Sequence, residues 1–252
     1  MSKYFILFLF FLTLVDAKMI SVDYRVEFGI IGQVAKVHTD YRNNGQTYMI
    51  DTHLSVIGML AKKVTDNLKE RHICKGTIDK NGLLIATSYE MQKSYGKYNS
   101  NTLYTVNHKN KSIYKTFKKW KSKLGQTKGM VDTYSEKLNY YSKDDLITFF
   151  LNLNHYITNK KLSKNYIFKV VGADKKNGRV DIRIPARKEK KEMMKLLNTA
   201  KKGEWIMNLV MHRQLYNSKK GELMVRMGTD GLIEKAVLKD LILLGDVRII
   251  RQ

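Results

Sequence analysis

Residues 22–57 read VDYRVEFGIIGQVAKVHTDYRNNGQTYMIDTHLSVI, and this stretch decides the fold. In positions 22–28, apolar residues alternate with the charged residues Asp23, Arg25 and Glu27. A period of two is typical of a β-strand that buries one face. The alternation returns over 33–41, and Asn44-Gly45 is then a hairpin-turn signal before a further strand over 47–57. The stretch therefore predicts consecutive antiparallel strands.

The same pattern continues along the rest of the chain. The turn signal recurs at Asn81-Gly82, at Asn177-Gly178 and as Thr229-Asp230-Gly231. Further strands are expected over 68–78, 83–95, 102–108, 166–171, 179–184, 204–215, 222–227, 233–239 and 243–250. Many strands joined by short turns predict a mainly β fold, either a curved antiparallel sheet or a partly open barrel.

One long helix interrupts the strands. Ser142-Lys143-Asp144-Asp145 resembles a capping box, which predicts a helix over 142–157. Ile147 and Leu151 widen its apolar face, and a helix this apolar is buried on most sides. We expect it against the concave face of the sheet, as a plug or a strut. The main apolar face supplies the candidates for a ligand groove, which are Leu146, Phe149, Phe150, Leu153 and Ile157.

Residues 58–65 predict a short linker of one or two helical turns. Residues 187–202 predict a basic amphipathic helix whose apolar residues are Met193, Met194, Leu196, Leu197 and Ala200. Such a helix either lies on an anionic membrane surface or packs on its own domain. The second interpretation is favoured because the apolar face is short and lacks Trp and Phe.

Residues 114–121 interleave aromatic residues with lysines, from Tyr114 through Phe117 to Trp120. Such a stretch can bind single-stranded nucleic acid or sit at a lipid interface. The favoured interpretation is a strand with its rings in the core and its lysines in water. The polar residues 122–141 that follow predict a mobile loop.

The amino end has the three parts of a secretory signal. Lys3 supplies a positive charge, residues 5–15 are apolar except for Thr13, and Val15-Asp16-Ala17 is a cleavage signal. The apolar run is shorter than the roughly 20 residues of a membrane-spanning helix. We therefore expect a cleaved signal peptide over 1–17, a single β-rich domain over 18–252, and a periplasmic location.

The charge of the chain indicates its partners. Lys and Arg number 46 against 23 Asp and Glu, which gives a formal net charge of +23. Export argues against nucleic acid, so the expected partners are a lipid or an anionic polymer of the cell envelope, and peripheral membrane contact is compatible with this charge. The alternative is that the charges are spread over solvated faces and serve solubility alone.

No motif of a catalytic nucleophile, a phosphate-binding loop or a zinc site is present. Cys74 is the one cysteine, so the chain has no internal disulfide. His72 and Cys74 are too few ligands for a closed zinc site, and a buried thiol is expected. His38 and His53 can face each other across the Asn44-Gly45 hairpin, most simply as a structural pair. We expect no catalytic residue, no metal and no cofactor, and hence no enzyme.

Several stretches together resemble a known family. They are residues 24–32 (YRVEFGIIG), 54–62 (LSVIGMLAK), 144–150 (DDLITFF) and the closing 245–248 (GDVR). On these residues the chain resembles the exported bacterial family called domain of unknown function 3108, and most resembles members from Campylobacter-like bacteria. The resemblance implies an exported, β-rich protein and supplies no catalytic residue.

The first functional hypothesis is a noncatalytic envelope protein that holds a lipid or other amphiphile between the sheet and the 142–157 helix. One alternative is a structural or assembly factor that binds cell-wall or outer-membrane components through a basic surface. The other is an enzyme that acts on envelope glycans or lipids. The sequence does not indicate the oligomeric state.

Overall fold

The computed structural model describes residues 18–123, 126–160, 162–173, 177–198, 200–211, 222–241 and 245–252. The expected signal peptide over 1–17 lies outside the described residues, so its cleavage stays a prediction.

Fourteen strands in the described part of the chain form one antiparallel sheet. The strands are β1 (Lys18–Phe28), β2 (Gly32–Asn43), β3 (Thr47–Val56), β4 (Lys69–Ile78), β5 (Leu84–Tyr95), β6 (Tyr98–Asn107), β7 (Ser112–Lys123), β8 (Gln126–Lys137), β9 (Asn165–Lys169), β10 (Arg179–Arg183), β11 (Trp205–Met211), β12 (Glu222–Met227), β13 (Ile233–Leu241) and β14 (Gly245–Arg251). Their spatial order is β8-β7-β6-β5-β4-β3-β2-β1-β14-β13-β12-β11-β10-β9. The first and last strands therefore pair in the middle, and the sheet stays open between its edges β8 and β9. The predicted mainly β, curved antiparallel fold is confirmed.

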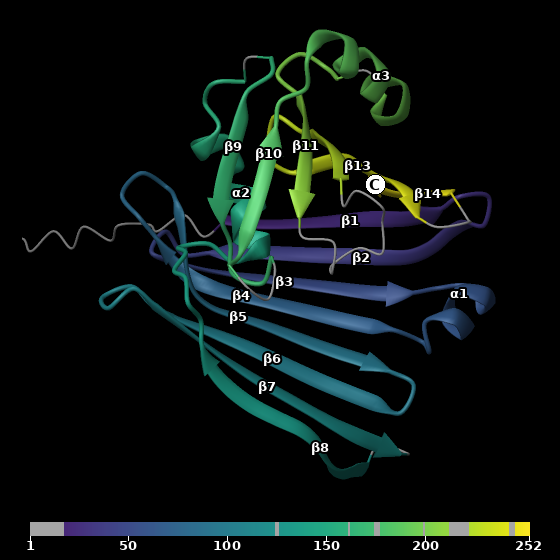
Figure 1. Ribbon diagram of the computed structural model, residues 1–252, viewed down its shortest axis with the longest axis vertical. Coiled ribbons are helices and arrows are strands. Elements are labelled where there is room, and N and C mark those ends of the chain that lie inside the picture. Colours follow the sequence, from purple (N-terminus) through teal and green to yellow (C-terminus); the bar gives the residue numbers. More distant parts are fainter. Residues whose placement is uncertain are drawn as a thin grey trace, which may run out of the picture.

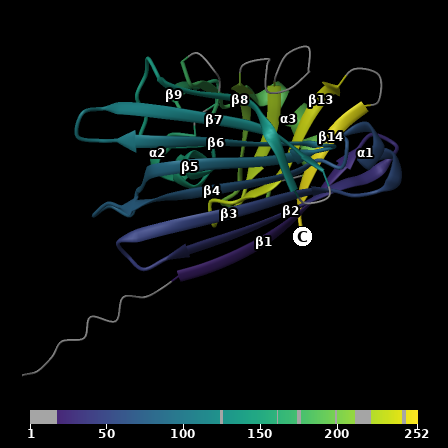
Figure 2. The same ribbon diagram turned by 90° about the horizontal axis from the view of Figure 1, so that it is seen from below.

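The sheet has two arms whose strands run in different directions. We call β1–β8 the N-terminal arm and β9–β14 the C-terminal arm. Strands β1–β7 run across the view of Figure 1, whereas β9–β11 run roughly at right angles to them. The view from below shows the same strands curving around α2 (Figure 2). The fold thus places a helix inside the curve of one continuous sheet.

The central helix α2 (Leu146–Tyr156) begins later than its sequence predicts. Its N-cap is Asp145, whose carboxylate accepts hydrogen bonds from the backbone N–H groups of Ile147 and Thr148. The expected start at Ser142 is wrong because the Ser142 hydroxyl instead donates to the Lys169 carbonyl, 2.6 Å away. Residues 142–145 therefore belong to the connection that anchors the helix.

Two further helices lie where the sequence predicts them. Helix α1 (Met59–Val64) fills the predicted linker. Helix α3 (Arg187–Leu197) begins where the basic segment predicts but ends before the expected residue 202. The apolar side of α3 buries Met193 and Leu197 against Ile206 of β11 and its neighbours. This confirms that α3 packs on its own domain.

Strand β8 replaces the mobile loop expected over 122–141, so that prediction is wrong. Strand β8 pairs with β7, with Glu136 opposite Lys115. It is an edge strand, and its residues 129–137 are mostly exposed. A strand with solvent on both faces needs no apolar alternation, because backbone pairing and a few side-chain contacts with β7 hold it in place.

The aromatic and lysine stretch lies in β7, but two of its side chains are reversed from the expectation. Tyr114 is 51% exposed and Lys115 only 8%. The Lys115 ammonium donates to the Glu136 carboxylate and to the Tyr134 hydroxyl, both at 2.8 Å. Because a buried cation is tolerated when it is paired in this way, the strand can turn Lys115 inward.

The apolar core has two main parts, which meet at α2. One side of the helix, represented by Phe149 and Leu153, packs against β9–β13. Another side, represented by Ile147 and Leu151, packs against the cluster of β3–β7 that contains Ile50. The helix is therefore buried between the two arms of the sheet.

Candidate functional site

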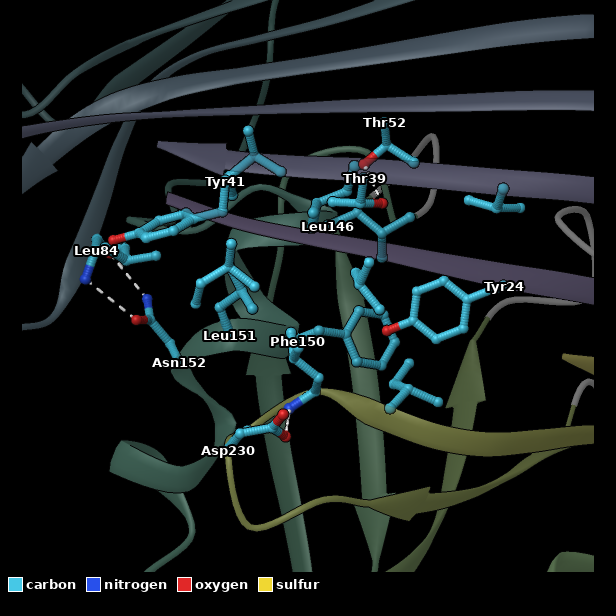
Figure 3. Close-up of a pocket in the computed structure, with 18 of the residues that line it drawn as sticks. Tyr24, Thr39, Tyr41, Thr52, Leu84, Leu146, Phe150, Leu151, Asn152 and Asp230 are labelled. Atoms are coloured by element: carbon cyan, nitrogen blue, oxygen red, sulfur yellow. Dashed lines mark hydrogen bonds between the residues drawn. The ribbon is translucent and has the colours of Figure 1, made fainter. Parts of the chain in front are cut away.

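A cavity of about 430 Å³ lies between α2 and the concave face of β1–β3 (Figure 3). The β4–β5 turn with the start of β5, the turn into β13 and one residue of β14 complete its wall. The lining residues are Lys18, Ile20, Val22, Tyr24, Val37, Thr39, Tyr41, Ile50, Thr52, Gly82, Leu84, Leu146, Ile147, Phe150, Leu151, Asn152, His155, Asp230, Gly231, Leu232, Ile233 and Ile249. Most of them are apolar, which is typical of a pocket for an organic ligand.

The strand side of the cavity follows from the alternation in residues 22–57. Val22 of β1 lies opposite Thr39 of β2, which in turn lies opposite Thr52 of β3. Residues that pair across neighbouring strands share a face of the sheet. The Thr39 and Thr52 hydroxyl oxygens are 3.0 Å apart and bond to each other. One of these two hydroxyls therefore donates to the other.

Asn152 provides a second polar group that is already satisfied. Its amide accepts from the Leu84 backbone N–H at 3.1 Å and donates to the Leu84 carbonyl at 2.8 Å. The same amide nitrogen donates to the Asp144 carboxylate at 2.6 Å. Asn152 therefore ties α2 to β5 and leaves the cavity wall effectively apolar.

Tyr24 and Phe150 point toward one another across the cavity (Figure 3). Burial raises the pKa of Tyr24 to about 12, so its hydroxyl is neutral at physiological pH. Charged groups among the lining residues include the exposed Lys18 and Asp230, and Asp230 accepts a 2.6 Å bond from Arg251. The cavity thus combines an apolar interior with a few charged groups, an arrangement that suits an amphiphile.

In the structure, the five groove candidates predicted from the sequence fall into two groups. Leu146 and Phe150 line the cavity. Phe149, Leu153 and Ile157 are fully buried and belong to the core on the C-terminal arm. Binding of a ligand at any of the five stays a prediction.

Sequence reasoning missed the strand residues of the site. The inward positions of β1–β3 supply almost half of the lining, including Tyr24 and Thr39. The period-two alternation identifies these positions as inward-facing, and this signal was sufficient to name them. It does not indicate which part of the concave face the helix leaves uncovered.

A buried polar cluster lies at the N-terminus of α2. Asp145 accepts from the Cys74 thiol at 3.0 Å and from the Thr148 hydroxyl at 2.7 Å. Thr148 also bonds to the Tyr48 hydroxyl at 2.9 Å. Burial and the nearby Asp145 carboxylate raise the pKa of Cys74 well above its ordinary value, so the thiol stays protonated and unreactive. The prediction of a buried thiol is confirmed.

Asp144 is the other buried carboxyl group of this connection. It is 6% exposed and accepts from the Tyr156 hydroxyl at 2.7 Å as well as from Asn152. Burial raises its pKa to about 6. Both oxygens are bonded within the protein, so the group serves to hold α2.

His38 and His53 pair with carboxylates rather than with one another. His38 lies opposite His53 in the β2–β3 ladder, as the hairpin predicts. His38 donates to Asp23 at 2.8 Å, and His53 approaches Asp51 at 3.0 Å. Among the described residues, no group of three or more His, Cys, Asp or Glu side chains is arranged to hold a metal ion.

Comparison with known proteins assigns no family and no function to this chain. No family model and no curated protein matches the sequence, so the resemblance to domain of unknown function 3108 stays a prediction. One similar solved structure is the beta-barrel-like protein of domain of unknown function DUF1849 from Brucella abortus. The two share 7% identity over 94% of this chain and 95% of that chain, with a TM-score of 0.47.

Within the described parts of this chain, no helix has the length and apolar character needed to cross a bilayer.

Proposed function

We propose that this protein is an exported, noncatalytic binding protein whose α2 cavity holds the apolar part of a lipid or similar amphiphile. The observation that carries the proposal is the cavity of about 430 Å³ with a largely apolar wall. Its volume falls within the roughly 300–1,000 Å³ of small-molecule sites. The secretory signal over 1–17 and the resemblance to domain of unknown function 3108 support a periplasmic location.

Several polar groups of the wall are held by partners within the protein, which favours binding over catalysis. Thr39 bonds to Thr52, Asn152 bonds to the β5 backbone, and Asp230 is paired with Arg251. A catalytic site needs titratable groups that are free to reach the substrate. Groups committed to partners within the protein instead leave desolvation of an apolar chain as the main source of affinity.

Two tryptophan substitutions on β2 test the proposal. Val37 lines the cavity, whereas the adjacent Lys36 is exposed on the outer face. The wild-type protein, secreted with its own signal and purified without detergent, is expected to carry a lipid that native mass spectrometry detects. Val37→Trp fills the cavity and is expected to abolish this adduct, while Lys36→Trp keeps it. Wild-type protein that carries no lipid and takes up none from phospholipid vesicles contradicts the proposal.

A further inference from the structure

A second hollow lies on the opposite, outer side of the sheet and shares no residue with the α2 cavity. It measures about 450 Å³ and crosses β3–β7. Its lining residues are His53, Leu54, Ser55, Lys69, Glu70, Arg71, Gln92, Lys93, Ser94, Asn99, Ser100, Asn101 and Trp120. Polar side chains dominate this set, in contrast to the apolar wall of the first cavity.

Strand register explains the shape of the hollow. One row of paired residues runs across the outer face through Ser55, Lys69, Ser94, Asn99 and Trp120. Short side chains in the middle of this row leave space, and Trp120 bounds it on β7. The neighbouring row runs through His53, Arg71, Gln92 and Asn101.

Planar polar side chains of the second row are held in place by carboxylates. Arg71 donates to the two oxygens of Asp51 at 2.9 and 2.6 Å. Gln92 and Asn101 both donate to one oxygen of Glu90, at 2.9 and 2.6 Å. Each amide keeps a second N–H and a carbonyl oxygen, and the guanidinium keeps further N–H groups. The hollow therefore offers hydrogen-bonding groups whose orientation is set before a ligand arrives.

Trp120 and Lys69 add two further recognition elements. An indole ring gives a flat apolar surface with one N–H donor, which suits the mixed apolar and polar faces of a sugar ring. Lys69 is exposed and makes no ion pair among the described residues. Arg71 is paired with Asp51 and Lys93 with Glu70, so Lys69 is the cation of the lining that attracts an anion, while Arg71 adds its remaining N–H donors.

From this arrangement we infer that the outer hollow binds an acidic oligosaccharide, with one sugar ring on Trp120 and its carboxylate or sulfate group toward Lys69 and Arg71. A single-stranded nucleic acid also stacks on aromatic rings and follows lysines. Such strands are bound by successive rings along a basic groove. This hollow has one large aromatic ring, that of Trp120, and the His53 imidazole at its other end, with several amides and hydroxyls between them, so its chemistry favours a sugar.

Tryptophan fluorescence provides a direct assay, because Trp120 and Trp205 are the two tryptophans of the chain. Trp205 is 5% exposed and donates its indole N–H to Asn154, so a ligand on the outer face changes the emission of Trp120 alone. The probes are a galacturonic acid hexasaccharide, a heparin hexasaccharide, neutral cellohexaose and a thymidine oligonucleotide. We expect saturable quenching by at least one acidic sugar, with an affinity about tenfold or more above that for cellohexaose.

Calorimetry on matched variants then locates the site. Trp120→Ala is expected to weaken binding of the acidic sugar about tenfold or more. Tyr114→Ala is the control, since Tyr114 is an exposed aromatic residue of the same strand outside the hollow. Lys69→Gln, an exposed substitution, weakens the acidic sugar several-fold without changing the melting temperature. Equal effects of Trp120→Ala and Tyr114→Ala, no binding of either acidic sugar at millimolar concentration, or tighter binding of the oligonucleotide overturns the inference. Lipid retention in the α2 cavity is measured separately and is not affected by these variants.

Discussion

Two adjacent phenylalanines of α2 are expected to respond differently to truncation. Phe149 is fully buried and packs with its ring centroid 5.0 Å from that of Phe168. Truncation of a buried Phe to Ala typically costs about 3–5 kcal/mol of unfolding free energy. In a domain of this size each kcal/mol lowers the melting temperature by about 2–4 °C, so Phe149→Ala should lower it by about 6–20 °C. Phe150 is only partly buried and faces the existing cavity, so Phe150→Ala is expected to cost about 1 kcal/mol.

Thermal melts of lipid-free protein measure both effects. Lys160→Ala is the control, because Lys160 is an exposed residue just beyond the helix and surface changes stay within about 0.5 kcal/mol. Lipid retention is measured on the same variants. Phe150→Ala is expected to lose the bound amphiphile, whereas Lys160→Ala is expected to keep it. If Phe150→Ala destabilises the protein as much as Phe149→Ala, the assignment of one ring to the core and the other to the cavity is refuted.

Three further predictions concern buried groups. Burial raises the pKa of Asp144 from 3.8 to about 6, so its contribution to stability is present below pH 3.8 and is lost as the pH rises through 6. The loss is about 3 kcal/mol, and urea unfolding should show a smaller fall in stability over this pH range in Asp144→Asn than in the wild type, because burial also raises the pKa of Asp145. Cys74→Ser keeps a hydrogen bond to Asp145 and should cost less than about 1 kcal/mol. Cys74→Val removes one of three hydrogen bonds to the same Asp145 oxygen, which keeps the Ile147 and Thr148 N–H donors, and should cost about 0.5–1.5 kcal/mol more than Cys74→Ser; equal urea midpoints contradict this. Gly76→Ala places a Cβ atom 2.1 Å from the Ile85 carbonyl oxygen. Overpacking of this kind costs about 1–3 kcal/mol, so the melting temperature of the variant should fall by several degrees. An unchanged melting temperature counts against this packing.

The alternation of residues was sufficient to predict most of the strands. It located β1–β6 closely, and the Asn44-Gly45 turn set the register that places His38 opposite His53. It failed at β8, where both faces of an edge strand meet solvent and no apolar period is required. It also failed at Lys115, because Glu136, the partner that lets a lysine turn inward, lies in that same unrecognised strand.

The candidate site was less predictable than the fold. A helical wheel groups Phe149 with Phe150, but it does not show that two arms of a sheet enclose the helix from different sides. Only the curvature of the sheet decides that Phe149 faces the C-terminal arm while Phe150 faces β1–β3. The two arms are joined by the pairing of β1 with β14, two strands that are more than 200 residues apart in the sequence.

The connection into α2 determines how firmly the cavity is held. The Lys143 carbonyl accepts from the Ala86 N–H at 2.8 Å, and the Asp144 carbonyl accepts from the Val171 N–H at 2.9 Å. One bond reaches the N-terminal arm and the other the segment after β9, so the start of the helix is tied to both sides. Asn152 adds a tie to β5 two turns later. Movement of α2 away from β1–β3 would break several buried hydrogen bonds at once, each costly to leave unmade. A bulky side chain at Val37 therefore occupies the cavity instead of displacing the helix, which is why Val37→Trp tests occupancy rather than stability.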